Sequence, residues 1–155
     1  MKGNSVLYIY HNKQIASANI SFMPETGPKS LFAKYIANRP DIDPDGMLDI
    51  IAHGNSEQIE IVNNYKNIRI NAREASKLIK RLPGYKKAKS IRLFSCNTGS
   101  TINGFAQNLA NSLGKTVYAP NMTIYSNYRG AYWISDKGKR GEFIKFIPGG
   151  YRNGK

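Results

Sequence analysis

The chain contains one cysteine and two histidines, and two of these three side chains follow apolar segments that are typical of β-strands. Cys96 comes after residues 91–95 (IRLFS), and His53 comes after residues 47–52 (MLDIIA). In an open α/β sheet, ligands bind at the carboxyl ends of the strands. A thiol attacks as its thiolate, and an imidazole can accept the thiol proton. The pattern therefore predicts a Cys–His dyad with Cys96 as nucleophile and His53 as general acid and base.

The residues beside these two positions offer groups that stabilise an oxyanion or orient a side chain. Gly54 has no side chain, so its amide can approach a developing oxyanion together with the amide of Cys96. Asn55, Ser95 and Asn97 are candidate orienting groups, and the sequence does not single out one of them as a third catalytic residue. Cys96 also lies where a strand turns toward a helix, so backbone amides are expected to favour its thiolate.

Both residues of the dyad also have a purely structural interpretation. A lone cysteine at a strand end is commonly an inert buried thiol, and a histidine–glycine pair after a strand is commonly a turn. His11 follows an apolar segment without a neighbouring glycine and is interpreted as a surface residue. A metal site is not expected, because no pair of histidines or cysteines has metal-binding spacing.

The length and composition are those of one folded domain. A chain of 155 residues with 41% hydrophobic residues can bury a sizeable core, which argues against intrinsic disorder. We expect a single α/β domain over residues 1–150, a flexible tail over residues 151–155, and a monomer. One cysteine cannot form an internal disulfide, which fits a reducing compartment.

The net charge and the hydropathy of the chain restrict the kinds of partner that the protein can bind. Lysine and arginine number 23 against 10 acidic residues, and the resulting net charge of +13 suits a polyanionic partner as well as simple solubility. No apolar run approaches the roughly 18 residues that a membrane span needs. Residues 1–10 lack the long apolar core and cleavage site of a secretory signal, so we expect none.

Alternating strand and helix patterns predict a mostly parallel central sheet that is flanked by helices. Asn71 and Glu74 have the spacing of a capping box. Residues 15–22 are either a hairpin partner of the first strand or a loop, and residues 122–147 contain β-like segments typical of a terminal β-hairpin or flap. Strands are predicted at residues 6–10, 47–52, 58–62, 90–95 and 116–119, and helices at residues 30–38, 71–82 and 103–113.

The order of these features resembles the caspase–hemoglobinase superfamily of cysteine peptidases (clan CD). In that superfamily a histidine and a glycine follow one core strand and the cysteine ends the next, as His53, Gly54 and Cys96 do here. The runs LFSCNTG, GFAQNLANSLG, TVYAP and ISDKGKRGEFIKFIPGG extend the likeness over residues 47–150. They are similar to self-cleaving cysteine protease domains of large bacterial toxins and to caspase-like modules at the C-termini of polymorphic toxins.

The resemblance implies a caspase-like cysteine endopeptidase that acts as a bacterial toxin or effector on a protein substrate. Cys96 would be the nucleophile, His53 the general acid and base, and the amides of Gly54 and Cys96 the oxyanion donors. Such a protein would be made in the bacterial cytoplasm and then secreted or translocated into a target cell. Residues 94–96 (FSC) replace the glutamine-alanine-cysteine signature of animal caspases, so no cleavage preference is implied.

The resemblance also implies an activator, although no cofactor is required for the chemistry itself. In the large-toxin domains a β-flap with basic residues nearby responds to inositol hexakisphosphate, and residues 123–146 would correspond to that flap. Clustered lysines and arginines match a compact polyphosphate, and the alternative is an ordinary solvated basic face. The residues implied are Lys86, Lys87, Lys89, Arg92, Arg129, Lys137, Lys139, Arg140 and Lys145.

Two other classes of function fit the same sequence. One is a basic nuclease-type toxin that uses His53, His11 or tyrosine side chains on RNA, with the positive charge as its nucleic-acid footprint. The other is a binding domain without catalytic activity, in which His53 and Cys96 are structural. Replacing Cys96 by alanine separates both classes from a peptidase, because neither needs the thiol.

Overall fold

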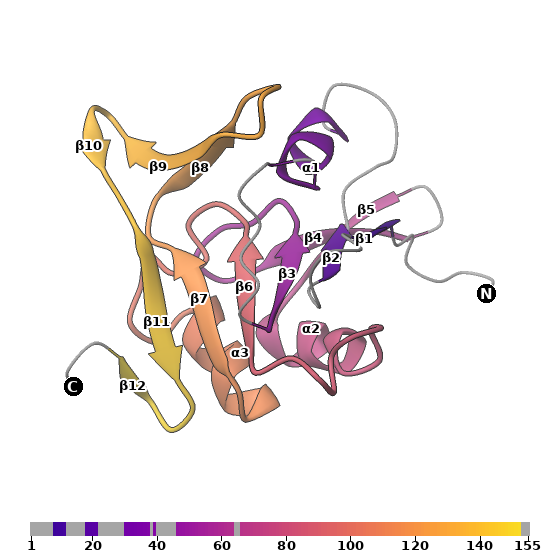
Figure 1. The fold of residues 1–155 in the computed structure, drawn as a ribbon. Helices are drawn as coiled ribbons and strands as arrows, with labels where there is room; N and C mark the ends of the chain where they lie inside the picture. The colour runs from indigo at the N-terminus through magenta and orange to yellow at the C-terminus, as the bar shows by residue number, and fades with distance from the viewer. Residues whose placement is uncertain are drawn as a thin grey trace.

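The computed structural model describes residues 8–11, 18–21, 30–37, 39, 46–63 and 66–152. These residues form a central sheet, two smaller sheets and helices on both sides (Figure 1). In spatial order, the central sheet contains β1 (Tyr8–His11), β2 (Ala18–Ser21), β3 (Met47–Ile51), β6 (Ser90–Phe94), β7 (Thr116–Pro120), β11 (Phe143–Ile147) and β12 (Tyr151–Arg152). The other elements are α1 (Ser30–Ala37), β4 (Ile59–Asn63), β5 (Lys66–Ile70), α2 (Ala72–Ile79), α3 (Phe105–Leu113), β8 (Thr123–Ser126), β9 (Tyr132–Asp136) and β10 (Lys139–Arg140).

The centre of the main sheet is parallel and its edges are antiparallel. Neighbouring strands β2, β3, β6 and β7 all run in the same direction. β1 pairs antiparallel with β2, so residues 15–22 contain a hairpin partner of the first strand rather than only a loop. This mixed sheet with helices around it confirms the α/β architecture that the sequence predicts.

The C-terminal β-segments divide between two sheets. β8, β9 and β10 form a three-stranded antiparallel sheet, called the flap sheet below, which confirms the expected hairpin. β11 was expected in the same flap but instead pairs with β7, with Ile144 opposite Ala119. The physical reason is burial, because Ile144 and Phe146 alternate along β11 and both enter the central core. Tyr151–Arg152, in the expected tail, form β12 beside β11.

Local sequence signals mark the start of α2 and the end of α3, whereas α2 ends at Ile79 rather than at the predicted residue 82. The Asn71 Oδ1 atom accepts from the Glu74 amide at 2.9 Å, and the Glu74 carboxylate accepts from the Asn71 amide at 2.9 Å, which is the predicted capping box. α3 ends at Gly114, which has the left-handed φ of 68° that glycine adopts without strain. None of the helices in the described ranges is both long and apolar enough to cross a bilayer.

Both faces of the parallel strands are covered by apolar side chains. On one face, Leu48 and Ile50 of β3 pack with α2 and α3 in the larger core. On the other face, Ile51 and Phe94 pack with α1 and with the inner side of the flap sheet. The alternation along β3 and β6 therefore fixes which side chains face α1 and the flap sheet, and this is the face that Cys96 shares.

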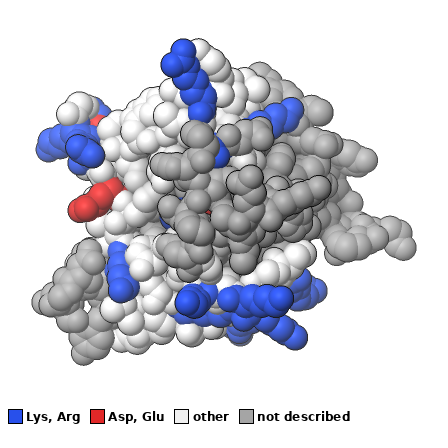
Figure 2. Space-filling view, viewed as in Figure 1, with Lys and Arg blue, Asp and Glu red and all other residues white. Residues whose placement is uncertain are grey.

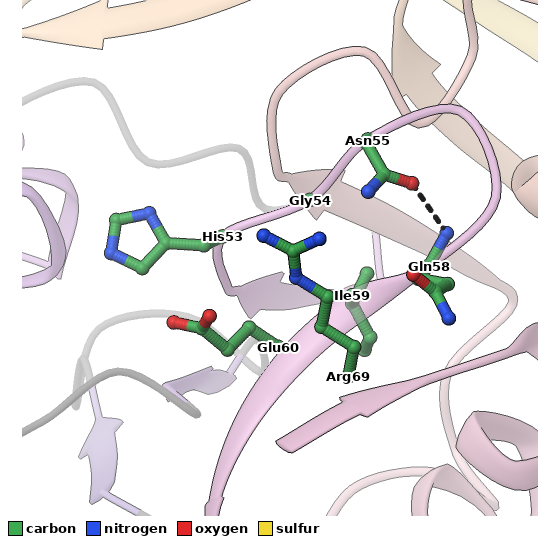
Figure 3. A pocket seen from close by; sticks show the side chains of 7 residues that line it. All are labelled: His53, Gly54, Asn55, Gln58, Ile59, Glu60 and Arg69. Carbon is green, nitrogen blue, oxygen red and sulfur yellow. Dashed lines mark hydrogen bonds between the residues drawn. The ribbon is translucent and has the colours of Figure 1, made fainter. Parts of the chain in front are cut away.

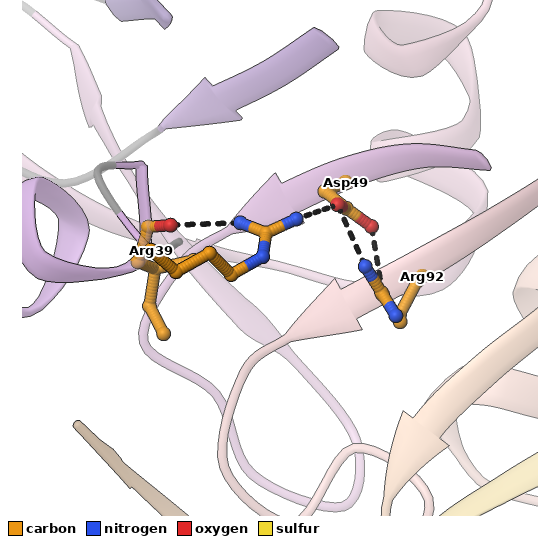
Figure 4. A network of polar contacts seen from close by, with 4 residues as sticks. Arg39, Asp49 and Arg92 are labelled. Atoms are coloured by element: carbon orange, nitrogen blue, oxygen red, sulfur yellow. Dashed lines mark hydrogen bonds and ion pairs between the residues drawn. The ribbon is translucent and has the colours of Figure 1, made fainter. Parts of the chain in front are cut away.

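A buried ionic cluster joins β3 to β6 on that second face (Figure 4). Arg92 donates to both carboxylate oxygens of Asp49, from Nε at 2.8 Å and from Nη2 at 2.9 Å. Arg39 donates to the same carboxylate at 2.5 Å, and both guanidinium groups lie 5.0 Å from the centre of the Phe94 ring. Asp49 and Arg92 are opposite each other in the β3–β6 register, so the bidentate pair reinforces that register.

The position of Arg92 corrects one part of the sequence analysis. Arg92 was expected on a polyanion-binding surface, but only 5% of it is exposed and its guanidinium is paired with Asp49. The reason lies in strand alternation. Arg92 points to the same face as Phe94, beneath α1 and the flap sheet, so it cannot contribute to a solvated basic face.

We expect Asp49→Ala to destabilise the protein strongly. It leaves two buried guanidinium groups without their shared carboxylate, and breaking a buried pair in this way costs about 3–5 kcal/mol. Urea unfolding followed by circular dichroism measures the change. The control is Asp136→Ala, which removes an exposed carboxylate from β9 and should change stability by about 0.5 kcal/mol or less. Equal stability of the two variants would contradict the importance assigned to the cluster.

Candidate active site

The carboxyl ends of β3 and β6 bring the two candidate catalytic residues to equivalent positions. The strands are adjacent and parallel, and Ile51 lies opposite Phe94 in their register. His53 follows Ile51 by two residues and Cys96 follows Phe94 by two residues. The strand adjacency that a dyad requires is therefore present, at the sheet edge where the sequence analysis expected it.

Strand alternation places two register pairs on the face that Cys96 shares. They are the Asp49–Arg92 ion pair and the apolar pair Ile51–Phe94. Cys96 packs against the apolar cluster that contains Ile51 and Phe94. His53 lies two residues beyond the end of β3 and borders a pocket on the side of the β4–β5 hairpin.

Gly54 allows the two loops that follow these strands to touch. A Cβ atom added to Gly54 would lie 2.3 Å from the Ser95 Oγ atom and 2.8 Å from the Thr98 Cγ2 atom. Both distances are shorter than any real contact of a Cβ atom, so only glycine fits here without a shift of its neighbours. The need for glycine after His53 therefore arises from close approach to the Cys96 loop.

Two backbone amides near this contact are candidate donors to an oxyanion. The Ala52 amide donates to the Phe94 carbonyl at 3.3 Å, which extends the β3–β6 ladder past the ends of the strands. Within the described ranges, neither the Gly54 nor the Cys96 amide donates a backbone hydrogen bond to another residue. An oxyanion hole requires donors that are not bonded to backbone carbonyls, and these two amides meet that condition.

The turn after Cys96 is held in one conformation by its backbone. Asn97 has a left-handed φ of 60°, which asparagine tolerates better than most residues. Its amide donates to the Met122 carbonyl at 3.1 Å, and the Gly99 amide donates to the Pro120 carbonyl at 2.8 Å. These bonds tie the loop after β6 to the segment between β7 and β8, so Cys96 lies directly beside the flap sheet.

The helix that follows does not support a thiolate. The first amides of α3 are occupied, because Phe105 donates to the Ser56 carbonyl at 2.7 Å and Ala106 donates to the Thr98 carbonyl at 3.1 Å. Backbone hydrogen bonds involving Ile124 and Cys96 itself favour the thiolate, as expected, but the first amides of α3 do not contribute to them. Those amides instead attach the loops after β3 and β6 to α3.

The surroundings of Cys96 favour the neutral thiol. The sulfur atom lies 3.8 Å from the Ile124 carbonyl oxygen of β8, and the side chain packs against apolar residues. Burial raises the pKa of the Cys96 thiol, and backbone hydrogen bonds involving Ile124 and Cys96 itself act in the opposite direction. In this conformation the Cys96 thiol is therefore protonated and partly covered by the flap sheet.

His53 borders a small pocket with a volume of about 70 Å³ on the side of the β4–β5 hairpin (Figure 3). Cys96 is not among the residues that line it, so the structure does not bring the two side chains into one shared pocket. Glu60 and Arg69, which are opposite each other in the hairpin, also line the pocket. The Glu60 amide donates to the His53 carbonyl at 2.8 Å, which fixes the backbone of His53.

The sequence analysis missed Glu60 and Arg69 as neighbours of His53. It predicted β4 from alternation but not β5, where four of the five residues are exposed and apolar alternation is weak. Glu60 and Arg69 carry opposite charges and lie in two short consecutive segments. Such pairs commonly lie opposite each other in a hairpin, so this pattern could have indicated the pairing of β4 with β5.

The three candidate orienting residues also have structural contacts. The Asn55 Oδ1 atom accepts from the amides of Glu57 and Gln58 at 2.8 and 2.9 Å, so this oxygen closes a turn. Ser95 is buried against Gly54, and Asn97 contributes its backbone conformation. In the described part of the chain, no group of three His, Cys, Asp or Glu residues is arranged to hold a metal ion.

The expected polyanion-binding residues do not form one surface. Lys137, Lys139 and Arg140 are exposed at the turn between β9 and β10, whereas Lys86, Lys87 and Lys89 are exposed in the connector that enters the amino end of β6. Figure 2 shows lysines and arginines gathered separately at the upper left, where β10 lies, and along the lower edge of the molecule. A compact polyphosphate cannot bridge both groups.

The connector, which is the segment between α2 and β6, is held in place by Lys115, the residue immediately before β7. Its ammonium group donates to the carbonyl oxygens of Tyr85 and Ala88, the latter at 2.8 Å, and lies 3.8 Å from the centre of the Tyr85 ring. Burial lowers the pKa of Lys115. Lys115 is therefore a structural cation, and the three exposed connector lysines around it stay solvated.

Comparison with known families places the chain in one of them. Residues 18–134 match a family described as a domain of unknown function, DUF8616, so the chain belongs to that family. The match spans β2 through β9 and therefore includes both strand ends that carry His53 and Cys96. No curated protein and no solved structure matches.

We expect Gly54→Ala to destabilise the protein by about 1–3 kcal/mol, the usual cost of overpacking a close contact. The added methyl group would collide with Ser95 Oγ and Thr98 Cγ2. Chemical denaturation measures the loss. Combining Gly54→Ala with Ser95→Ala removes the closest clash and should restore part of the stability. An alanine variant as stable as the wild type would contradict the close approach of the two loops.

We expect the Cys96 thiol of the native protein to react slowly with iodoacetamide at about pH 7 and faster as the pH rises past its ordinary pKa. The sign follows from burial, which raises the thiol pKa and so keeps the proton on sulfur at neutral pH. Because the chain has one cysteine, mass spectrometry of the intact protein reports this site alone. Urea-unfolded protein is the control and should react faster at neutral pH. A native rate that is already maximal at about pH 6 would contradict the neutral thiol.

Proposed function

We propose that the protein is a caspase-like cysteine endopeptidase with Cys96 as nucleophile and His53 as general acid and base. The observation that carries the proposal is the register of β3 and β6, which brings the two residues to neighbouring strand ends at the carboxyl edge of the sheet. Gly54 and Cys96 add amides without a backbone partner in the described ranges, as an oxyanion requires.

The order of features along the chain supports the caspase–hemoglobinase assignment. A histidine and a glycine follow β3, the cysteine follows the neighbouring parallel strand β6, and helices cover the larger core face. A flap made of antiparallel strands lies beside the cysteine. In this assignment the domain is a bacterial toxin or effector that is delivered from the bacterial cytoplasm into a target cell.

In the proposed reaction, His53 accepts the thiol proton as Cys96 Sγ forms a bond to the carbonyl carbon of a peptide. The electron pair of the carbonyl moves to oxygen, where the amides of Gly54 and Cys96 donate to it. The carbon–nitrogen bond then breaks as His53 returns the proton to the leaving amine. Water hydrolyses the thioester, and the thiol is regenerated.

Because the thiol is neutral, this scheme requires His53 to act as a base during the attack. Because burial raises the pKa of Cys96, the imidazole has to remove the proton during attack rather than sit beside a preformed thiolate. β8 also has to move away from the sulfur, which now lies 3.8 Å from the Ile124 carbonyl. Inositol hexakisphosphate, as the proposed activator, would act through Lys137, Lys139 and Arg140 of the flap sheet.

The test is substitution of each residue of the dyad. We expect Cys96→Ala and His53→Ala to reduce proteolysis, or toxicity in a host that expresses the domain, by at least about 1000-fold. Wild-type protein should also form a covalent adduct with a peptidyl acyloxymethyl ketone, with or without inositol hexakisphosphate. Ser112→Ala, an exposed change on α3, is the control for expression and handling and should stay active.

The outcomes separate the rival classes of function. Full activity of Cys96→Ala would overturn the peptidase proposal. If that variant also degrades RNA as fast as the wild type does, the protein is a nuclease in which Cys96 is structural. Absence of a covalent adduct with the wild type under both conditions would also overturn the proposal. Circular dichroism of each variant checks that the loss of activity does not come from unfolding.

A further inference from the structure

The outer face of the flap sheet carries an exposed aromatic pair. Tyr125 of β8 lies opposite Trp133 of β9, and their rings are stacked with centres 5.8 Å apart at 19°. The neighbouring pair Ile124 and Ile134 points the other way and is buried against the cluster that Cys96 joins. The flap sheet is therefore two-sided, with an aliphatic inner face and an aromatic outer face.

These rings are unusually open to solvent for large aromatic side chains. Tyr125 is 43% exposed and Trp133 is 46% exposed, although a folded chain gains most from aromatic residues when it buries them. Tyr128, at the turn between β8 and β9, is 72% exposed and contacts Arg129. Among the residues whose side-chain exposure the structure describes, the exposed aromatic residues all belong to this hairpin.

Polar and cationic groups surround the aromatic pair on the same face. Ser135 lies opposite Thr123 on one side and opposite Arg140 on the other, so these three side chains share the face of Trp133. Trp133 and Arg140 also line a shallow groove of about 670 Å³. Lys137 and Lys139 are exposed at the adjacent turn. Cations here outnumber the exposed acidic residues Asp136 and Glu142.

We propose that this outer face binds single-stranded nucleic acid. Unpaired bases would stack on Tyr125 and Trp133, and Arg140 with its neighbouring lysines would contact the phosphates. Stacking on aromatic side chains beside a basic groove is how proteins hold single strands without sequence readout. A base inside a duplex is already stacked on both sides, so the rings cannot reach it.

The chemistry around the rings favours this partner over a membrane or a dry protein interface. The positions beside Trp133 on the same face are filled by hydroxyl groups and a guanidinium group, namely Ser135, Thr123 and Arg140. Such groups form hydrogen bonds with phosphates and bases, whereas acyl chains offer no acceptors and a protein interface core is depleted in charge. The turn that would enter a bilayer first carries Arg129 beside Tyr128.

This binding face is separate from the proposed peptidase site. Tyr125 and Trp133 point away from the cluster that contains Cys96, and Ile124 and Ile134 lie between them. The proposal therefore does not depend on the Cys96 reaction, and the two can fail separately. Cys96→Ala should bind nucleic acid as well as the wild type does.

The single tryptophan makes a direct test possible, because all tryptophan fluorescence comes from Trp133. We expect oligo-dT and oligo-U of about 15 nucleotides to quench this fluorescence and to bind in fluorescence anisotropy, whereas a duplex of the same length does not quench it. Tyr125→Ala and Trp133→Ala should weaken binding by about 5-fold to 100-fold, and Trp133→Phe should lose less because phenylalanine still offers a ring face.

A matched control separates stacking from general electrostatics. Lys86→Ala combined with Lys87→Ala removes two exposed charges from the connector, far along the chain from the flap sheet, and should leave binding within about 2-fold. An equal loss in this control and in Tyr125→Ala would overturn the proposal. Circular dichroism and unfolding curves of each variant exclude loss by misfolding, since cross-strand aromatic pairs also stabilise hairpins.

Other partners give different results in the same assay. A blue shift of Trp133 fluorescence with anionic phosphatidylserine vesicles, without quenching by oligonucleotides, would overturn the proposal in favour of a membrane surface. Absence of any quenching by either oligonucleotide at low salt would overturn it outright. Saturable quenching that weakens with rising salt and needs a higher oligonucleotide concentration in Tyr125→Ala would support it.

Discussion

The bidentate pair between Asp49 and Arg92 is the interaction on which the rest of the structure depends. It joins β3 to β6 in one register inside the protein, where a shift of either strand would separate two buried charges. Ile51 and Phe94 extend the same alignment with apolar side chains. The positions of His53 and Cys96 follow from this register, because both residues lie two positions beyond that aligned pair.

The cluster also links the central sheet to the elements that cover it. Arg39, which follows α1 along the chain, donates to the Asp49 carboxylate, and both arginines contact the Phe94 ring. Phe94 in turn contacts Tyr132 and Phe143 edge to face at 5.2 and 5.6 Å. The face that carries Cys96 is therefore covered by α1 and the flap sheet, and access to Cys96 depends on how firmly β8 is held.

Much of this arrangement could be predicted from the sequence, because the signals are local. Apolar segments predicted the strands that precede His53 and Cys96, and the Asn71–Glu74 spacing predicted the start of α2. The sequence left open whether β3 and β6 are neighbours, and their adjacency is known only from the structure. The features that were predicted, namely these strands and the start of α2, each depend on only a few neighbouring residues.

The features that the sequence did not reveal depend on pairing between distant segments. Arg92 looked like one more cation after a run of lysines, and only the register shows that it faces Asp49. A charged residue at the third position of both strands, MLDII and SIRLF, was a usable signal. In the same way, β11 was assigned to the flap because its return to β7 depends on which core can bury Ile144 and Phe146.

The side chain of Lys115 has a consequence for the order in which the protein folds. It closes the stretch from Tyr85 through β6, α3 and the start of β7, whose pairing spans fewer residues of chain than the pairing of β3 with β6. Contacts that are closer in sequence tend to form earlier, and β3 reaches β6 only across the segment that contains β4, β5 and α2. We therefore expect pulsed hydrogen exchange to protect β6 and β7 before β3. On that route the thiol is in place first, and the imidazole follows only when β3 pairs with β6.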